Sequence, residues 1–458
     1  MNRSFDPLTL SEFARYYGFH YDRIDPAGLV EDVLFEMDRG LNGQTSSLPM
    51  IPAYISPAAA ATPGKTVIAL DAGGTNLRSA LVTFDESGKA LATDSRKTPM
   101  PGTNGPVGAD AFFDEIAAHA APLIEKAGAG LEGIGFCFSY PMEITKEADA
   151  VLLAFSKELD APEVIGKTIG AGLRDALGRR KVAAPERIVM LNDTVATLLS
   201  GLSQRSAQGE FRGGESRVDA EAGPLVGFIL GTGFNTAYPE KNIPKIGFDS
   251  PSRPQIVVCE SGSFAHRYMG LLDREHDSAT KNPGDYTFEK ATAGAYLGTL
   301  TFHIIRQALK DGLFSFAKQD EFLSWPLLHT KDLNAFLHAP LARSGVIAEL
   351  FGDDERDAIS AFAYIASLIT QRSALLSAAM VAAAVEKAGG GRDPFVPVSV
   401  AVDGTTFAVF KGMRSSLESY LHVILNRHRP CAYNIALVEQ ASLLGAAVAA
   451  VTAVTAKE

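Results

Sequence analysis

Cysteine is scarce in this chain. Its 458 residues include three cysteines, at positions 137, 259 and 431, which are far apart and have none of the spacings typical of metal sites. A reducing cytoplasm is therefore the simplest compartment. The N-terminal residues include Asp6, Glu12 and Arg15 but no apolar core segment. They do not resemble a signal peptide, and we expect a cytoplasmic protein.

Positive charge is also in short supply. The chain has 42 lysines and arginines against 53 aspartates and glutamates, and its formal net charge is -11. Nucleic acids and anionic membranes need a basic face, so neither is expected as the main partner. A polyanionic ligand must therefore be held by local groups and by a metal ion.

Several common nucleotide and catalytic motifs are missing. No HExxH, CxxC or GxSxG motif is present. Residues 64–66 and 166–168, both Gly-Lys-Thr, imitate the end of a P-loop, but Ala59 and Ala161 occupy the position of the required first glycine. The sequence therefore argues against a P-loop nucleotide-binding protein.

A clear membrane span is absent as well. The segment 441–456 is apolar, but it is only about as long as the shortest spanning helix. Ser442, Gly445 and two threonines interrupt it, and Glu439 and Gln440 precede it. We interpret it as a closely packed helix and expect no membrane association.

Apolar residues are plentiful, at 46% of the chain with 21% charged residues, so two sizeable cores and two or three domains are expected. Asp25 and Pro26 predict the start of an amphipathic helix that ends near Gly40 or Gly43. Residues 44–64 carry four prolines and are typical of an extended crossing segment. Helices are predicted at 111–126, 164–177, 293–313 and 357–388, and buried strands at 133–141 and 187–191. Strands separated by helices predict a mixed α/β layer fold.

One stretch, residues 70–78 (LDAGGTNLR), organises the rest of the chain. Apolar runs of strand length flank its Gly-Gly pair, which predicts a β-hairpin over residues 66–84. Paired glycines allow a tight bend and leave N–H groups uncovered, so a phosphate is the expected ligand. Asp71 cannot attract a phosphate directly, but it can hold Mg²⁺ through the ion's water shell. An ordinary hairpin with an incidental aspartate is the alternative.

The same pattern returns later in the chain. Residues 224–238 are again strand, Gly/Thr turn and strand, and a third hairpin of this kind is predicted at 398–409. Two phosphate-type hairpins are much less probable by chance than one. Residues 203–223 are polar and glycine-rich, and they predict an exposed loop near a domain boundary.

With these stretches in view, the chain resembles the hexokinase family, within the actin, Hsp70 and sugar-kinase superfamily of ATPases. The resemblance runs from about residue 48 to near the C-terminus. It rests on five motifs in family order, at residues 70–78, 136–141, 191–195, 230–235 and 402–405. It implies an α/β fold of two ribonuclease-H-like (actin-like ATPase) domains with a cleft between them. We expect a small domain of residues 67–204 plus 441–458 and a large domain of 1–66 plus 205–440.

The resemblance implies ATP-dependent phosphorylation of a hexose, most simply glucose at its 6-hydroxyl, with Mg²⁺ as cofactor. Phosphoryl transfer passes through a loose transition state, so the site mainly neutralises charge and aligns two oxygens. By resemblance, Asp71 lies by the magnesium ion, and the residues that hold phosphates or nucleotide are Gly73, Gly74, Thr75, Asn76, Arg78, Gly231, Thr232, Gly233, Asp403, Gly404 and Thr405. Gly404 and Thr405 lie by the adenosine.

Asp193 is our candidate for the base that takes the proton from the attacking sugar hydroxyl. It follows a strand and begins a helix, where the helix N-terminus favours the carboxylate and lowers its basicity. An Asn-Asp pair in this position is also a common N-cap, but its place in the family motif favours the catalytic role. Lys157, after Ser156, resembles the family's lysine near the transferred group; a surface lysine is the alternative.

A sugar offers a ring of hydroxyl groups, which carboxylates and amides bind better than apolar walls do. The residues that match this need by resemblance are Ser139, Ser156, Lys157, Asn192, Asp193, Asn235, Glu260 and Glu289. Glu289 is next to Lys290, and such a pair at a helix start is commonly solvated. The expected partners are a hexose and ATP, for a monomer or homodimer.

The chain departs from the family pattern in places. Ser156 stands where the family usually has Thr, and Thr405 where it often has Ser. Residues 438–443 replace a Gly-rich acidic turn, with Ala441 and Leu443 in place of glycines, which predicts a tighter or differently placed nucleotide loop. Two rival hypotheses stay open at this point. A non-catalytic hexose sensor on the same fold would have lost Asp193 or the phosphate glycines, and a chaperone or filament ATPase would need no polar sugar set.

Overall fold

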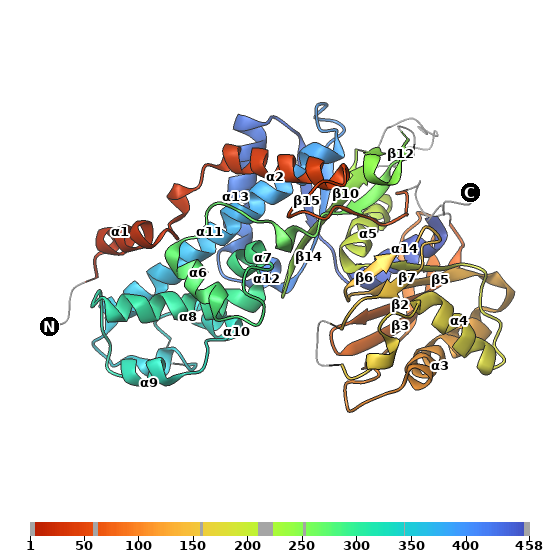
Figure 1. Cartoon of the computed structure of the whole chain (residues 1–458), viewed down its shortest axis with the longest axis horizontal. Coiled ribbons are helices and arrows are strands. Elements are labelled where there is room, and N and C mark those ends of the chain that lie inside the picture. Colours follow the sequence, from red (N-terminus) through yellow and green to blue (C-terminus); the bar gives the residue numbers. More distant parts are fainter. Residues whose placement is uncertain are drawn as a thin grey trace.

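The computed structural model describes residues 5–57, 63–155, 159–208, 223–250, 253–342 and 344–452. Two larger sheets organise this part of the chain (Figure 1). The predicted Ser156 and Lys157 and most of the predicted loop at 203–223 lie outside the described residues.

The first large sheet has five strands in the order β4-β3-β2-β5-β8. Its strands are β2 (Thr66–Gly73), β3 (Asn76–Phe84), β4 (Ala90–Pro99), β5 (Leu131–Phe138) and β8 (Ile188–Leu191). Strands β2, β3 and β4 form an antiparallel meander, while β5 and β8 continue the sheet in parallel with β2. The helices α3 (Ala109–Ala127) and α4 (Ile169–Arg179) share a buried apolar cluster with one face of this sheet.

The second large sheet has six strands in the order β1-β13-β10-β9-β14-β15. Its strands are β1 (Ile51–Pro52), β9 (Leu225–Leu230), β10 (Phe234–Glu240), β13 (Gln255–Val258), β14 (Val398–Asp403) and β15 (Tyr433–Leu437). Strand β14 lies between β9 and β15 and runs parallel to both. The long helix α11 (Arg356–Ala388) packs on one face of this sheet.

Two helices, α5 (Asp193–Gln208) and α14 (Ala441–Thr452), form the layer between the sheets (Figure 1). The backbones of these helices and of β5 approach one another closely here. A Cβ on Gly445 would be 1.9 Å from the carbonyl oxygen of Ala196, and one on Gly135 would be 1.8 Å from that of Ala446. The predicted close packing of the apolar C-terminal segment is confirmed through Thr452, because only small side chains permit these contacts.

The remaining elements are helices and two small two-stranded sheets, β6-β7 and β11-β12. The helices are α1 (Pro7–Tyr17), α2 (Pro26–Leu41), α6 (Leu271–Ser278), α7 (Thr287–Thr292), α8 (Gly294–Lys310), α9 (Gln319–Ser324), α10 (Thr330–His338), α12 (Thr405–Val409) and α13 (Met413–Val423). The short strands are β6 (Met142–Ile144), β7 (Ala150–Leu152), β11 (Asn242–Ile243) and β12 (Phe248–Asp249). Helix α2 begins as predicted, since the Asp25 carboxylate accepts a hydrogen bond from the Ala27 N–H at 3.1 Å.

Two predictions about local structure are wrong. Residues 405–409 form helix α12 rather than the second strand of a third hairpin. Both edges of β14 are already occupied by β9 and β15, so a returning strand has no edge to pair with. The predicted loop at 203–223 begins too early, because residues 203–208 belong to α5 and contain no glycine or proline.

Among the described helices, α11 is long and apolar enough to cross a membrane by length and composition alone. In this protein 94% of its most apolar window is buried inside the structure. Such burial is what the central helix of a large core requires.

Candidate active site

The turn between β2 and β3 brings its polar residues to one end of the five-stranded sheet. Gly73 pairs with Asn76 in the ladder, and Gly74 adopts a left-handed φ of 66° that closes the turn. The Tyr140 hydroxyl donates to the carbonyl of Gly74 at 2.5 Å and fixes the bend. Thr75 at its tip is exposed and accessible to a ligand.

Asp71 lies in β2, two residues before the strand ends at Gly73, and it is buried. The Arg78 guanidinium, on the paired strand β3, is 3.8 Å from a carboxylate oxygen of Asp71. Ser139 follows β5, and its N–H donates to the carbonyl of Ala72 at 3.0 Å. The structure therefore brings the predicted Asp71, Arg78 and Ser139 together at one edge of the sheet.

A second glycine turn, between β9 and β10, contacts the end of β14. A Cβ on Gly231 would be 3.4 Å from the Cα of Gly404, and one on Gly404 would be 2.3 Å from the carbonyl carbon of Leu230. Gly404 has a φ of 127°, which L-residues rarely adopt. The Thr406 hydroxyl closes the contact by donating to the carbonyl of Gly231 at 2.7 Å. The predicted nucleotide residues of both motifs thus form one surface, with Thr232 and Thr405 exposed on it.

The predicted sugar residues of the second sheet form a hydrogen-bonded group. The Asn235 side-chain amide donates to Glu260 Oε1 at 3.0 Å, and its oxygen accepts from the N–H groups of Thr236 at 2.9 Å and Ser261 at 3.2 Å. Glu289 Oε2 accepts from the N–H of Phe234 at 3.0 Å. Backbone N–H groups therefore orient Asn235 and Glu289, and they hold both side chains next to the turn between β9 and β10.

Electrostatics place Asp193 beside this group. Burial is the main cause that raises the pKa of Glu260 to about 7; the hydrogen bond from Asn235 opposes the rise, and the nearby carboxylates of Asp193 and Glu289 contribute to it. Burial also raises the pKa of Glu289, and Asp193 adds to that rise. The carboxylates of Asp193, Glu260 and Glu289 are therefore close enough for their charges to interact.

The charge of Asp403, in the second sheet, interacts with charged groups of the first sheet and of α5. Burial raises its pKa, the carboxylate of Asp193 raises it further, and the guanidinium of Arg78 lowers it. Arg78 belongs to the first sheet and Asp403 to the second, so the two glycine turns face a common space.

Asn192 and Asp193 have different roles at the start of α5. The Asn192 side-chain oxygen accepts from the N–H of Val195 at 2.9 Å and so acts as the N-cap. Asp193 is the first residue of the helix, where the helix dipole stabilises a carboxylate. The capping role that could have explained Asp193 therefore belongs to its neighbour.

The altered turn before α14 keeps a left-handed bend without glycine. Gln440 has a φ of 53°, and Ala441 begins the helix directly after it. A non-glycine residue in this conformation is strained, and such residues concentrate at functional sites. The turn follows β15, which is the direct neighbour of β14 and its Gly404 end.

Two residues near Glu260 and Glu289 are missing from the predicted site, the buried Lys290 and the exposed Tyr286. The alternative of a solvated Glu289–Lys290 pair is wrong, because the Lys290 side chain is only 5% exposed and its ammonium group bonds Asp277. Tyr286, with a left-handed φ of 53°, lies near Glu260 and Glu289, whose carboxylates add to the effect of burial and raise its pKa. Its position three residues before Glu289 was the available sequence signal.

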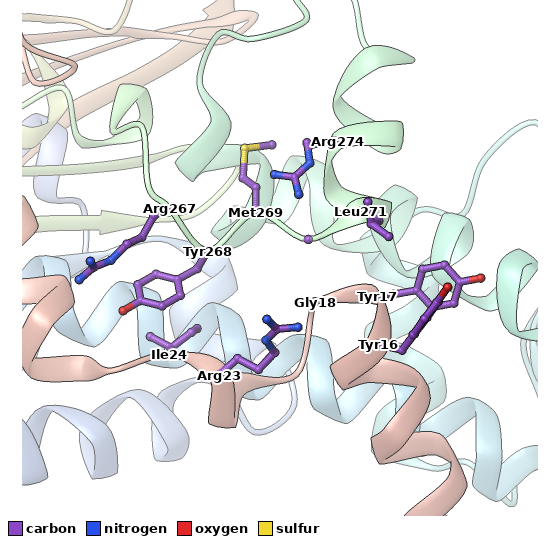
Figure 2. A pocket seen from close by; sticks show the side chains of 11 residues that line it. Tyr16, Tyr17, Gly18, Arg23, Ile24, Arg267, Tyr268, Met269, Leu271 and Arg274 are labelled. Carbon is purple, nitrogen blue, oxygen red and sulfur yellow. The ribbon is translucent and has the colours of Figure 1, made fainter.

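The pocket in Figure 2 belongs to a different part of the molecule. It has a volume of about 330 Å³ and lies where the end of α1 meets the segment before α6. Arg23, Tyr268 and Arg274 are among the residues that line it, and none of the predicted site residues does.

A magnesium ion at this site would need the phosphate groups of a bound nucleotide as well as protein side chains. No group of three or more His, Cys, Asp or Glu side chains within the described ranges is arranged to hold a metal. A single buried carboxylate, Asp71, next to a phosphate turn fits Mg²⁺, which keeps most of its waters and binds through one or two carboxylates and substrate phosphates.

Comparisons with known proteins agree with this arrangement. Two family models, both described as hexokinase, match residues 15–202 and 225–452. Hexokinase-7 of Oryza sativa subsp. japonica is 27% identical over 445 residues, which are 92% of this chain and 92% of the relative. Human hexokinase-3 is 28% identical over 435 residues, which are 91% of this chain but 44% of the human protein. The structure of a Schistosoma mansoni hexokinase complexed with glucose has a TM-score of 0.75 at 22% identity, over 98% of this chain and all of that one.

The fold is that of a two-domain actin-like ATPase, as expected. The chain belongs to the hexokinase family, and it is an enzyme that phosphorylates a sugar with ATP. Asp193 and the glycines of both turns are present, whereas a non-catalytic sensor would have lost one or the other.

Proposed function

We propose that the protein transfers the γ-phosphoryl group of ATP to the 6-hydroxyl of a hexose, with glucose as the preferred sugar. The observation that carries this proposal is the group formed by Asn235, Glu260 and Glu289, which is fixed by hydrogen bonds beside Asp193. Several oriented acceptors around one space bind a polyol and reject analogues that lack hydroxyl groups. The glucose bound to the Schistosoma mansoni hexokinase, which shares the fold, supports the choice of sugar.

In this proposal the sugar hydroxyl lies against Asp193, which takes its proton as the bond to phosphorus forms. A loose transition state demands little basicity until late in the transfer, so a carboxylate at a helix N-terminus is basic enough. Glu260, Glu289 and Asn235 orient the ring, and Asn192 and Ser139 stand beside it. Ser156 and Lys157 complete the set by family resemblance and lie outside the described residues.

ATP is held, on the same proposal, between the two glycine turns. Gly73, Gly74, Thr75, Asn76 and Arg78 bind phosphates from the first sheet. The matching groups of the second sheet are Gly231, Thr232 and Gly233, with Asp403, Gly404 and Thr405 toward the nucleoside. Asp71 would hold Mg²⁺ through the ion's water shell, and the ion would neutralise phosphate charge there.

A panel of hexoses with coupled detection of ADP tests the assignment directly. We expect glucose-dependent ADP formation that needs both Mg²⁺ and an unsubstituted 6-hydroxyl, so that 6-deoxyglucose gives none. ADP formation that does not depend on any sugar would contradict the proposal and favour an ATPase of the chaperone or filament type.

A further inference from the structure

Lys290 occupies an unusual position for a lysine. It follows the proposed sugar ligand Glu289 in α7, and only 5% of its side chain is exposed. Lysines are almost never fully buried unless they are paired. Its ammonium group lies 2.5 Å from Asp277 Oδ1 and 2.6 Å from the carbonyl oxygen of Asn282. Lys290 is therefore held by one charged and one neutral acceptor.

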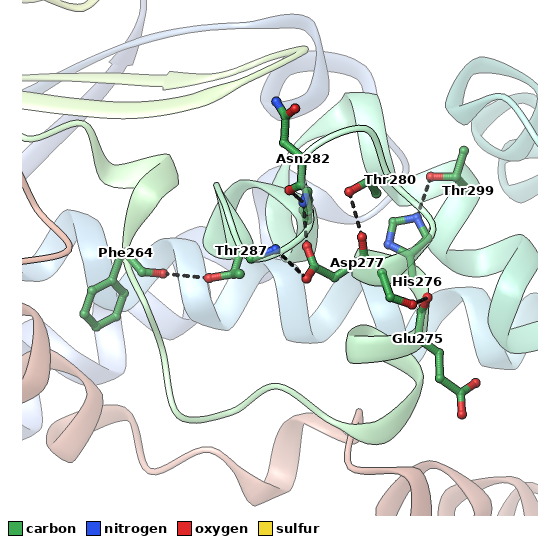
Figure 3. Close-up of polar contacts among 11 residues, drawn as sticks. Phe264, Glu275, His276, Asp277, Thr280, Asn282, Thr287 and Thr299 are labelled. Carbon is green, nitrogen blue, oxygen red and sulfur yellow. Dashed lines mark hydrogen bonds and ion pairs between the residues drawn. The ribbon is translucent and has the colours of Figure 1, made fainter.

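Asp277 is the residue on which the surrounding segment converges (Figure 3). It lies near the end of α6, and its second carboxylate oxygen accepts from the N–H of Gly284 at 2.8 Å. Its backbone carbonyl accepts from the Thr280 hydroxyl at 2.7 Å. One carboxylate thus joins the end of α6, the exposed loop at 279–286 and the helix that carries Glu289.

Buried hydrogen bonds fix both α6 and α7 to the central helix α11. At the other end of α6, both carboxylate oxygens of Asp273 bond the Arg372 guanidinium at 2.6 Å, and both side chains are buried. Arg372 belongs to α11, and the Ser373 hydroxyl next to it donates to the carbonyl of Thr292, the last residue of α7. Helices α6 and α7 are therefore both fixed to the central helix, and Asp277 and Lys290 join them to each other.

Helix α7 needs such external support. It has six residues, too few for a helix that is stable by itself, and its N-cap residue Tyr286 is held in a left-handed conformation. Glu289 reaches the site from this helix through one hydrogen bond to the N–H of Phe234. A small rotation of α7 would move its carboxylate away from a bound sugar.

We propose that the Asp277–Lys290 ion pair is a positioning device that holds α7 so that Glu289 meets the hexose. The inference rests on the proposed function, because it takes Glu289 to be a sugar ligand. A misplacement of about 1 Å in a bound group can cost on the order of a hundred-fold, so loss of the pair should act on sugar binding as well as on stability.

The test compares five variants by hexose KM, ATP KM, kcat, thermal unfolding and calorimetric titration with glucose. Lys290→Met removes the cation at nearly constant length. The double variant Asp277→Asn, Lys290→Met removes both charges and leaves no uncompensated buried carboxylate, so it provides a folded protein if the single variant fails to fold. Lys290→Arg keeps the positive charge that Lys290→Met removes. Lys126→Met, which breaks an exposed pair with Asp94, is the matched control. Glu289→Gln reports on the sugar ligand itself.

We expect Lys290→Met and the double variant to raise the hexose KM and the glucose Kd by about ten-fold or more, with the ATP KM within about two-fold of wild type. Lys290→Arg should recover most of the affinity, and Lys126→Met should match wild type. If Glu289→Gln weakens glucose binding but the folded double variant binds glucose normally, the ion pair is only structural and the inference is overturned. If Glu289→Gln binds glucose normally, the sugar-site assignment fails instead.

Discussion

Asn235 donates a hydrogen bond to Glu260 at 3.0 Å, and this contact joins the start of β10 to a residue two positions after the end of β13. Glu260 is a carboxylate in a largely buried place, beside Asp193 and Glu289, and it has a left-handed φ of 54°. Strained backbone and crowded carboxylates both cost stability, and a protein retains them where a ligand needs them. A sugar's hydroxyl groups meet that need because each can donate to an ionised acceptor.

Hexose binding should depend on pH through Glu260. Burial, with help from Asp193 and Glu289, raises the pKa of Glu260 to about 7, so the group becomes protonated within the neutral range. The ionised form is the acceptor that sugar hydroxyl groups need. We therefore expect kcat/KM for the hexose to fall as the pH drops below about 7, since this parameter reports ionisations of the free enzyme. Glu260→Gln should lose this limb of the profile, and an unchanged profile in the variant would exclude Glu260 as its source.

The same ionisation should appear in the stability of the sugar-free protein. The folded-state pKa of Glu260 lies above the ordinary value of 4.5, so between these two values the folded protein binds more protons than the unfolded chain. Stability should then fall as the pH rises through this window, by up to about 3 kcal/mol for this group. Urea unfolding at a series of pH values should show Glu260→Gln gaining stability over wild type toward pH 8. A constant difference between the two proteins would contradict this linkage.

Asp193→Ala should separate binding from chemistry. The side chain lies at the first position of α5, where Asn192 already supplies the cap, so the helix should form without it. We expect turnover to fall by about two to four powers of ten, the usual worth of a positioned base, while glucose still binds. Coupled ADP detection and calorimetry measure the two quantities. Turnover within ten-fold of wild type would remove Asp193 from the role of base.

Gly404→Ala should damage the nucleotide side of the site. A Cβ there would be 2.3 Å from the carbonyl carbon of Leu230, and the φ of 127° suits glycine. Backbone must shift, and the shift displaces the Gly231 turn, so the ATP KM should rise by about ten-fold or more and the unfolding temperature should fall. Gly412→Ala, at an uncrowded left-handed glycine, is the control for φ alone. Equal effects of the two substitutions would show that the close contact with Gly231 has no role.

Sugar binding should draw the two sheets together. An open site would let water compete for the γ-phosphoryl group, and enzymes of this chemistry gain by excluding it. We expect the radius of gyration from small-angle scattering to decrease when glucose is added, and to stay constant when 6-deoxygalactose, a poor structural match, is added. An identical scattering curve with and without saturating glucose would count against closure.

Local patterns sufficed for much of this architecture. The Gly73–Gly74 and Gly231–Gly233 bends, the cap at Asp25 and the starts of α3, α8 and α11 follow from spacing and residue type, which act over a few neighbours. The motif order also predicted the family, which the comparisons confirm. The assignment of residues 67–204 and 441–458 to a small domain stays a prediction, as do the roles of the individual site residues and the cytoplasmic location.

The sequence by itself determined which residue types stand at strand ends and bends, because glycine, proline and capping residues act on their own backbone. Only the tertiary structure decided what those positions meet. Residues 405–409 became a helix because β14 has neighbours on both sides, and Lys290 became buried because α6 brings Asp277 to it. The pKa of Glu260 likewise depends on Asp193, 67 positions earlier in the chain. Burial and charge coupling depend on distance in space, and a linear pattern does not contain that distance.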